Sequence, residues 1–200
     1  MKRISAKNLA AYQAKRKFDH TPEPSGKKKT GHAKRPLFVI QKHAASRLHY
    51  DFRLEMDGVL KSWAVPKDIP TERGQKRLAM RVEDHPLDYA KFEGIIPKGN
   101  YGAGTVMVWD KGTYVVSGES PQEALKRGKI ELHLEGKKLK SDWTLVRMRG
   151  LSEPGKEPWL LIKTGNSISA LSARAADRSV LSARGMKRIA VSQPRSWNPK

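Results

Sequence analysis

The sequence predicts a mainly β protein, namely a small antiparallel β-barrel with one or two short helices and flexible basic tails. From Leu37 to Lys163 the chain consists of short apolar stretches with turn residues between them, a pattern that favours strands. Many short strands with one brief helix are typical of an antiparallel barrel or sandwich. We therefore expect a barrel domain at 37–163, a partly ordered basic segment at 1–36 and a flexible basic tail at 164–200.

The N-terminal segment divides into a helix and a connector. Residues 1–17 are expected to form a short basic helix whose few apolar supports include Leu9 and Tyr12. The Pro- and Gly-containing run 21–26, followed by Lys27–Lys29, cannot continue a helix. We expect it to be an extended, solvated connector.

Nine stretches of the central part are predicted to be strands because apolar residues alternate or cluster in them. They are Leu37–Ile40, Leu48–Leu54, Val59–Val65, Arg77–Val82, Thr105–Trp109, Thr113–Val116, Lys129–Leu134, Trp143–Met148 and Trp159–Lys163. Residues 56–58 (Met-Asp-Gly) and 110–112 (Asp-Lys-Gly) lie between pairs of these stretches and are predicted to be tight hairpin turns. Residues 100–104 form a glycine-rich loop.

The one clear helix signal lies between the sixth and seventh predicted strands. Ser120 and Glu123 have the spacing of a capping box, Pro121 occupies the first helical position, and Gly128 ends the helix about two turns later. Past Gly165 the chain becomes rich in Ser, Ala and Arg, which predicts a flexible tail.

The net charge of +20 is concentrated in the two terminal segments. Residues 1–36 carry 11 basic and 2 acidic residues, and residues 163–200 carry 8 basic and 1 acidic. Such segments attract phosphate backbones in a salt-dependent way. They lack the broad apolar face that a membrane-surface helix requires, so nucleic acid is the favoured partner and a membrane is not expected.

Composition also limits the chemistry. The chain has no cysteine, which excludes disulfides and thiolate metal sites, so a metal would need His, carboxylate or water ligands. No apolar run approaches the roughly 18 residues of a membrane-spanning helix, and the N-terminus has no apolar signal region. A soluble, cytoplasmic, nucleoid-associated monomer is therefore expected.

The most informative segment is the stretch from His43 to Leu54. Between Leu48 and Leu54 apolar and polar residues alternate, so a strand places His49, Asp51 and Arg53 on one face. His-x-Asp on a strand supplies two metal ligands, and His43 is placed to be a third. Arg53 beside them offers a planar fork that matches phosphate. The alternative is a half-buried strand with a solvated polar face.

A second cluster follows the fourth predicted strand, in the run from Arg81 to Tyr89. It enters a Pro-containing turn, where catalytic side chains often lie. His85 could act as a general acid or donate to a phosphate oxygen, and Tyr89 could orient the same oxygen. A surface loop with a satisfied histidine is the alternative.

Four strings carry a resemblance to a known family: QKHAASRLHYDFRLE, GVLKSWAVPK, VEDHPLDYAKFEG and IPKGNYGAGTV. They closely resemble the 3′-phosphoesterase domain of bacterial DNA ligase D, and the resemblance runs from about Phe18 to about Lys163. It implies a small β-barrel-like domain with a Mn²⁺-dependent activity at DNA primer–template 3′ ends. Such a domain removes a 3′-terminal ribonucleoside and then the remaining 3′-phosphate during non-homologous end joining. Co²⁺ or Zn²⁺ are further candidate metals, and a ligase, a polymerase and a Ku-type end-binding protein are candidate partners.

The resemblance also assigns residues. It implies that the metal ligands are His43, His49 and Asp51, that the scissile phosphate is contacted by Arg53, His85 and Tyr89, and that supporting polar roles fall to Gln41, Arg47, Lys67, Arg77 and Glu83. In the N-terminal segment Arg16 and Glu23 are retained, whereas Lys17 replaces an acidic residue of the family. That segment serves ribonucleoside removal in the family, so Lys17 bears on this step more than on phosphate removal.

Two further functions are compatible with the pattern. A His-x-Asp pair with a distant His on a β-barrel is also the metal site of non-haem iron oxygenases, although the basic charge and Arg53 argue against this. A non-catalytic basic module that binds DNA ends is the second alternative.

Overall fold

The computed structural model describes residues 9–26, 35–150 and 155–192. Its strands are β1 (Leu37–Ala44), β2 (Leu48–Met56), β3 (Val59–Pro66), β4 (Lys76–Pro86), β5 (Gly94–Ile96), β6 (Gly104–Val116), β7 (Lys129–Gly136), β8 (Lys140–Arg147) and β9 (Glu157–Lys163). The helices are α1 (Ala10–Ala14), the 3₁₀ helix η2 (Leu87–Lys91), α2 (Pro121–Arg127), α3 (Ala173–Ala176) and α4 (Met186–Val191).

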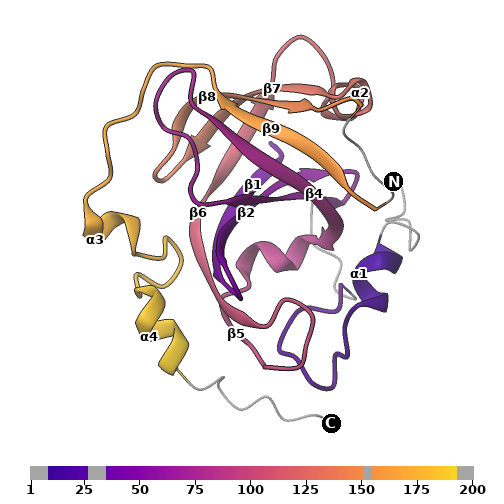
Figure 1. The fold of residues 1–200 in the computed structure, drawn as a ribbon, viewed down its shortest axis with the longest axis vertical. Helices are drawn as coiled ribbons and strands as arrows, with labels where there is room; N and C mark the ends of the chain where they lie inside the picture. Colours follow the sequence, from indigo (N-terminus) through magenta and orange to yellow (C-terminus); the bar gives the residue numbers. More distant parts are fainter. Residues whose placement is uncertain (1–8, 27–34, 151–154, 193–200) are drawn as a thin grey trace.

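The strands form a closed antiparallel barrel (Figure 1). Eight of them follow one another around the ring as β1-β2-β3-β4-β9-β8-β7-β6, and pairing of β1 with β6 closes it. The short β5 pairs with β6 beyond the part of β6 that contacts β7. The predicted β-barrel is therefore confirmed, and the sandwich alternative is excluded.

The barrel interior and its outer face near β1 and β2 carry separate apolar clusters. The interior cluster draws residues from all eight ring strands, including Phe38 and Phe52, and three fully buried tryptophans, Trp63, Trp143 and Trp159. The outer cluster joins α1, η2 and β5 to β1, β3 and β6. Because side chains alternate along a strand, the polar residues of β1 and β2 that the sequence placed opposite the apolar ones lie on the outer face.

One predicted hairpin turn is confirmed and the other is wrong. Asp57 and Gly58 have positive φ angles of 53° and 76° and connect β2 to β3. Residues 110–112 instead lie inside β6, which unites two predicted strands. Asp110 is buried, and its carboxylate accepts hydrogen bonds from four backbone N–H groups, three of them in the β7–β8 turn. Gly112 is required by close strand approach, because a Cβ there would lie 1.9 Å from the carbonyl oxygen of Glu135.

The predicted capping box is confirmed. The Ser120 side chain accepts a hydrogen bond from the Glu123 backbone N–H, the Glu123 carboxylate accepts one from the Ser120 backbone N–H, and Gly128 ends α2 with a φ of 88°. None of the helices in the described ranges is both long and apolar enough to span a membrane.

The N-terminal segment packs against the barrel over its described part. Residues 1–8 of the predicted helix and Lys27–Lys29 of the predicted connector lie outside the described residues. Within the connector, Thr21 and Glu23 are buried rather than solvated, because they form hydrogen bonds in the outer face described below.

Residues 165–192, for which the sequence predicts a flexible tail, instead carry α3 and α4 and contact the barrel. Ile189 is fully buried and belongs to the interior cluster. The Trp109 indole donates to the Ala176 carbonyl at 2.9 Å, and Lys42 pairs with Asp177 at 3.1 Å. The residues that hold this segment against the barrel are single residues spaced along a polar stretch, so no periodic apolar pattern predicts their contacts. The division of the chain at 36/37 and 163/164 stays a prediction.

Candidate metal centre and phosphate site

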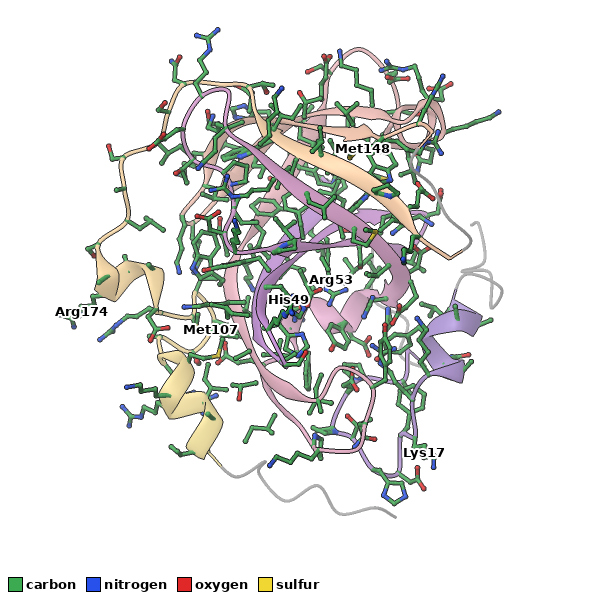
Figure 2. The ribbon with its side chains drawn as sticks, viewed as in Figure 1. Lys17, His49, Arg53, Met107, Met148 and Arg174 are labelled. Atoms are coloured by element: carbon green, nitrogen blue, oxygen red, sulfur yellow. The ribbon has the colours of Figure 1, made fainter. Side chains whose placement is uncertain are left out.

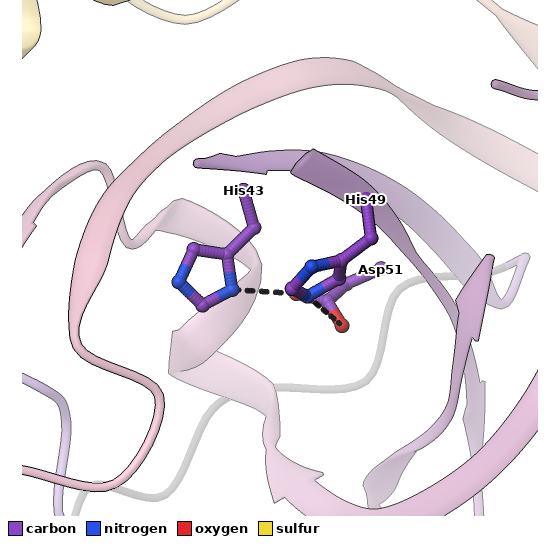
Figure 3. A group of neighbouring side chains, drawn as sticks. All are labelled: His43, His49 and Asp51. Carbon is purple, nitrogen blue, oxygen red and sulfur yellow. Dashed lines mark ion pairs between the residues drawn. The ribbon is translucent and has the colours of Figure 1, made fainter. Parts of the chain in front are cut away.

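His43, His49 and Asp51 converge on the outer face of the β1–β2 hairpin (Figure 3). His43 lies directly opposite His49 in the strand register, and Asp51 is two residues further along β2. One ligand atom from each of the three lies within 4.8 Å of the others. We call these three residues the metal group.

Hydrogen bonds to backbone carbonyls orient both imidazoles. His43 Nε2 donates to the Gly102 carbonyl at 2.9 Å, and His49 Nδ1 donates to the Arg47 carbonyl at 3.0 Å. The remaining nitrogens, His43 Nδ1 and His49 Nε2, face Asp51 oxygens at 3.5 and 3.9 Å. Such carbonyl contacts fix the tautomer that leaves a lone pair free for a cation.

Asp51 is held in its ionised form. Burial alone would raise the pKa of its carboxyl group, but Arg53 at 3.2 Å and the neighbouring His43 outweigh burial and hold the pKa well below its usual range. Two imidazole nitrogens and one carboxylate are a donor set that fits Mn²⁺, Co²⁺ or Zn²⁺. The His49 side chain remains 24% exposed, so the metal group is open to solvent on that side.

Arg53 occupies a buried socket beside the metal group. Its Nε donates to Gln41 Oε1 at 2.8 Å, its Nη1 donates to Ser62 Oγ at 2.8 Å, and its Nη2 pairs with Asp51. Gln41 is fully buried and also donates to the backbone carbonyls of Tyr89 and Phe92. Gln41 therefore positions Arg53 against η2, and the Tyr89 ring covers the guanidinium with a centroid distance of 4.9 Å.

His85 lies at the end of β4, on the far side of Arg53 from the metal group. Its Nδ1 donates to the Glu83 carbonyl at 2.9 Å, and its Nε2 faces the Arg16 guanidinium at 3.3 Å. Burial, followed by the charges of Arg53 and Arg16, lowers the pKa of His85 well below its usual value. His85 is therefore a neutral acceptor at Nε2 near pH 7.

Two residues of the N-terminal segment, Arg16 and Glu23, complete the site. Arg16 donates to Glu23 at 2.9 Å and to Glu83 at 3.2 Å, with its side chain only 4% exposed. The Tyr89 hydroxyl donates to the same Glu23 oxygen at 2.9 Å, and burial, reinforced by Glu23, raises the pKa of Tyr89. We call residues 9–26 the leader.

The structure thus gathers most of the predicted site residues. The metal group, Gln41, Arg53, Glu83, His85, Tyr89, Arg16 and Glu23 form one connected network. The side chains of three predicted residues lie outside it. Arg47 and Lys67 are exposed, and Arg77 donates to Asp68 on the loop after β3. Lys17 is exposed, and its side chain makes no hydrogen bond or ion pair within the described ranges.

Sequence reasoning missed two members of the network. Ser62 bridges Arg53 and the carbonyl of Leu60, and its Oγ lies 3.4 Å from His85 Nδ1. Its signal was a serine on a mostly apolar strand that pairs with β2. Lys15 donates to Glu83 at 3.0 Å, which no pattern in the basic leader distinguishes from its neighbouring cations.

Comparison with protein families bears directly on this site. A family model described as the DNA Ligase D 3′-phosphoesterase domain matches residues 41–147, a span that includes the metal group and more than half of the chain. The chain belongs to the DNA ligase D 3′-phosphoesterase domain family. The resemblance carried by the four sequence strings is thereby confirmed.

Curated relatives extend the match within this phosphoesterase family. The multifunctional non-homologous end joining protein LigD of Pseudomonas aeruginosa is 50% identical over 177 residues, covering 87% of this chain and 20% of that protein. LigD of Mycobacterium tuberculosis is 46% identical over 147 residues, covering 72% of this chain and 19% of that protein. LigD of Mycolicibacterium smegmatis is 44% identical over 152 residues, with coverage of 72% and 20%. The chain spans about a fifth of the length of these relatives.

Proposed function

We propose that this protein is a divalent-metal-dependent phosphoesterase that repairs DNA 3′ ends during non-homologous end joining. The observation that carries the proposal is the metal group beside Arg53, which combines a cation site with a phosphate-binding fork on one face of one hairpin. Family membership supplies the substrate class. The activity removes a 3′-phosphate and, with the leader, a 3′-terminal ribonucleoside.

The residues of the chain have distinct roles in this proposal. A divalent ion in the metal group, Mn²⁺ as the leading candidate, would supply Lewis-acid polarisation of a phosphate oxygen. Arg53 uses two of its five N–H groups on Gln41 and Ser62 and forms an ion pair with Asp51 through Nη2, so both terminal nitrogens keep N–H groups for the phosphate. Those donors are pre-oriented, so they stabilise charge that develops on the phosphorus oxygens.

His85 acts first as a neutral group. Its low pKa in the free protein means that it becomes a proton donor only after a phosphate dianion binds near it and raises that pKa. Tyr89 stays the third proposed contact of the phosphate, beside Arg53 and His85. Tyr89 and Glu83 also hold the leader and orient Arg16, because their polar atoms bind leader residues.

The leader is assigned to ribonucleoside removal. Arg16 faces His85, and Glu23 accepts a hydrogen bond from Tyr89, so these two leader residues lie beside the proposed phosphate site. Lys17 is exposed where the family has an acidic residue, so its effect falls on the bound ribonucleoside and not on folding. We propose that the protein acts as a monomer at the nucleoid in the cytoplasm, together with a ligase, a polymerase and a Ku-type protein, as suits a relative of LigD.

Purified protein should be incubated with two primer–templates, one ending in a 3′-phosphate and one in a single ribonucleotide, with and without Mn²⁺. We expect Mn²⁺-dependent conversion of both ends to 3′-OH, with the ribonucleotide end slower. His49→Ala should abolish both reactions and remove Mn²⁺ binding by calorimetry. His133→Ala is the matched control, because His133 is also flanked by carboxylates, Asp142 and Glu135, but lies on β7. Mn²⁺-independent turnover, or full turnover by His49→Ala, would refute the proposal.

The alternatives predict other results. An iron oxygenase would consume a 2-oxo acid with Fe²⁺, and it needs a distal histidine later in the chain, whereas the third ligand here is His43, before the His-x-Asp pair. A non-catalytic module would bind the primer–template without releasing phosphate or nucleoside.

A further inference from the structure

A cavity of about 400 Å³ is lined by residues of α3, of α4 and of the chain between them. These two helices lie on the opposite side of the barrel from α1 (Figure 1). The cavity lining contains three arginines, Arg174, Arg178 and Arg188, and one carboxylate, Asp177. All of its lining residues lie between Ala173 and Arg188, within the C-terminal segment. The cavity is separate from the metal group and from the leader.

The positive charge of the cavity is not compensated. Within the described ranges the side chains of its three arginines make no ion pair or hydrogen bond, whereas the nearby Arg184 pairs with Glu93. The single carboxylate is already shared, since Asp177 binds Lys42 at 3.1 Å. Like charges that converge without a counter-charge repel one another, and a bound anion removes that repulsion. Guanidinium forks match phosphate oxygens in particular.

The lining also indicates which kind of phosphate fits. The remaining lining residues are Ala173, Ala183 and Gly185, so the cavity offers no aromatic ring on which a base could stack. Base recognition outside a duplex depends on such rings. The chemistry therefore favours backbone phosphates over a free nucleotide.

The cavity is linked to the strand that carries the metal group. Lys42 of β1 reaches Asp177, and the next residue along β1 is the metal-group residue His43. The backbone of Val180, in the loop between α3 and α4, donates to Val108 of β6, the strand that pairs with β1. Because Lys42 and His43 are neighbours on β1, their side chains point to opposite faces of the strand, and DNA that contacts both sites must pass around the β1–β6 pair.

We propose that this cavity binds phosphates of the DNA backbone a few nucleotides away from the 3′ end that the metal group holds. The proposal rests on the proposed function for the identity of the polyanion. It assigns the C-terminal segment as a second anchor that fixes the direction in which DNA leaves the site. This second anchor recognises the charge of the DNA backbone and not the base sequence.

The test compares two double variants with the same loss of charge. Arg174→Ala with Arg178→Ala removes two of the three arginines of the cavity, while Lys126→Ala with Arg149→Ala removes two exposed cations, one on α2 and one just after β8. In Figure 2, Met148 at the end of β8 lies far from Arg174 on α3. Both pairs are introduced into the His49→Ala protein, so that binding is measured without turnover. Fluorescence anisotropy with a 3′-phosphorylated primer–template is followed over a range of salt concentrations.

We expect the cavity variant to raise Kd roughly tenfold and to reduce the slope of log Kd against log salt by about 0.9 for each lost phosphate contact. The control variant should change Kd less than twofold. In the active protein, the cavity variant should raise KM for the primer–template and leave turnover of a 3′-phosphorylated dinucleotide, which is too short to reach the cavity, at the wild-type value.

Equal effects of the two double variants would overturn the proposal, because net charge alone would then explain binding. A loss of dinucleotide turnover would also overturn it, since the cavity would then act through the fold. The proposal would also be overturned if the cavity variant changed only the inhibition by inorganic phosphate, because the cavity would then be a site for small anions. If the protein binds DNA as expected but releases no phosphate, the proposed function fails and the cavity assignment stands.

Discussion

Ser62→Ala tests how Arg53 is positioned. Ser62 is fully buried on β3, accepts a hydrogen bond from Arg53 Nη1 at 2.8 Å and donates to the Leu60 carbonyl at 2.9 Å. Alanine removes the acceptor and leaves one N–H of a buried, charged guanidinium without a partner. A hydrogen bond to a charged group contributes about 1.5–3 kcal/mol, so kcat/KM for a 3′-phosphorylated primer–template should fall roughly 10- to 100-fold. Affinity for Mn²⁺ should stay unchanged, because no metal-group residue is touched.

The matched control is Ser141→Ala on β8. Ser141 Oγ accepts a hydrogen bond from the buried Lys163 at 2.7 Å, so the same change removes the same kind of hydrogen bond to a cation outside the site. Initial rates with saturating Mn²⁺ give kcat/KM, and calorimetry gives the affinity for Mn²⁺. The reasoning is refuted if Ser62→Ala loses no more activity than Ser141→Ala, or if it weakens Mn²⁺ binding by the same factor as activity.

Three further predictions concern the metal group, His85 and the leader. Asp51→Asn should weaken Mn²⁺ binding at least 100-fold in calorimetry, and unchanged affinity would remove Asp51 from the metal group. Stability should fall as pH drops below about 6.5. In the unfolded chain His85 then takes up a proton, whereas in the folded protein its lowered pKa keeps it neutral. His85→Asn should flatten this part of a plot of thermal midpoint against pH, and an unaltered slope would contradict the lowered pKa. Glu23→Gln should reduce the free energy of unfolding, measured in urea, by about 3 kcal/mol. Arg16 would keep its ion pair with Glu83 but lose the buried carboxylate of Glu23. A loss below about 0.5 kcal/mol would be that of a surface ion pair and would contradict the prediction.

Alternation along β2 was sufficient to predict the shared face of His49, Asp51 and Arg53. The period of a strand fixes which side chains point the same way, and that information is local. The place of His43 depends on a three-residue turn and on the register of β1 against β2, so its position in the sequence only suggested a third ligand and the family resemblance added most of the support. The number of strands predicted a barrel or a sandwich, and no pattern specified which strands close the ring.

The errors have a common physical cause in long-range contacts. Asp110 next to Lys111 and Gly112 has the composition of a turn, yet its carboxylate serves the β7–β8 turn about 27 residues later. Ser62 functions only because Arg53 lies across from it. Ile189 anchors the C-terminal segment as a single residue, which leaves no periodic pattern to detect. In each case a partner distant in sequence decides the role.

The leader is part of the fold and of the site at once. Tyr12 is fully buried in the outer apolar cluster, while Arg16 faces His85 and Glu23 accepts a hydrogen bond from Tyr89. A fragment that begins at residue 37 would keep the metal group, but it would lose Arg16 and Glu23 and expose the apolar residues that Tyr12 covers. A mutation in the leader that changes which damaged ends are accepted therefore also lowers stability, so evolution can adjust this choice only within the stability that the barrel can spare.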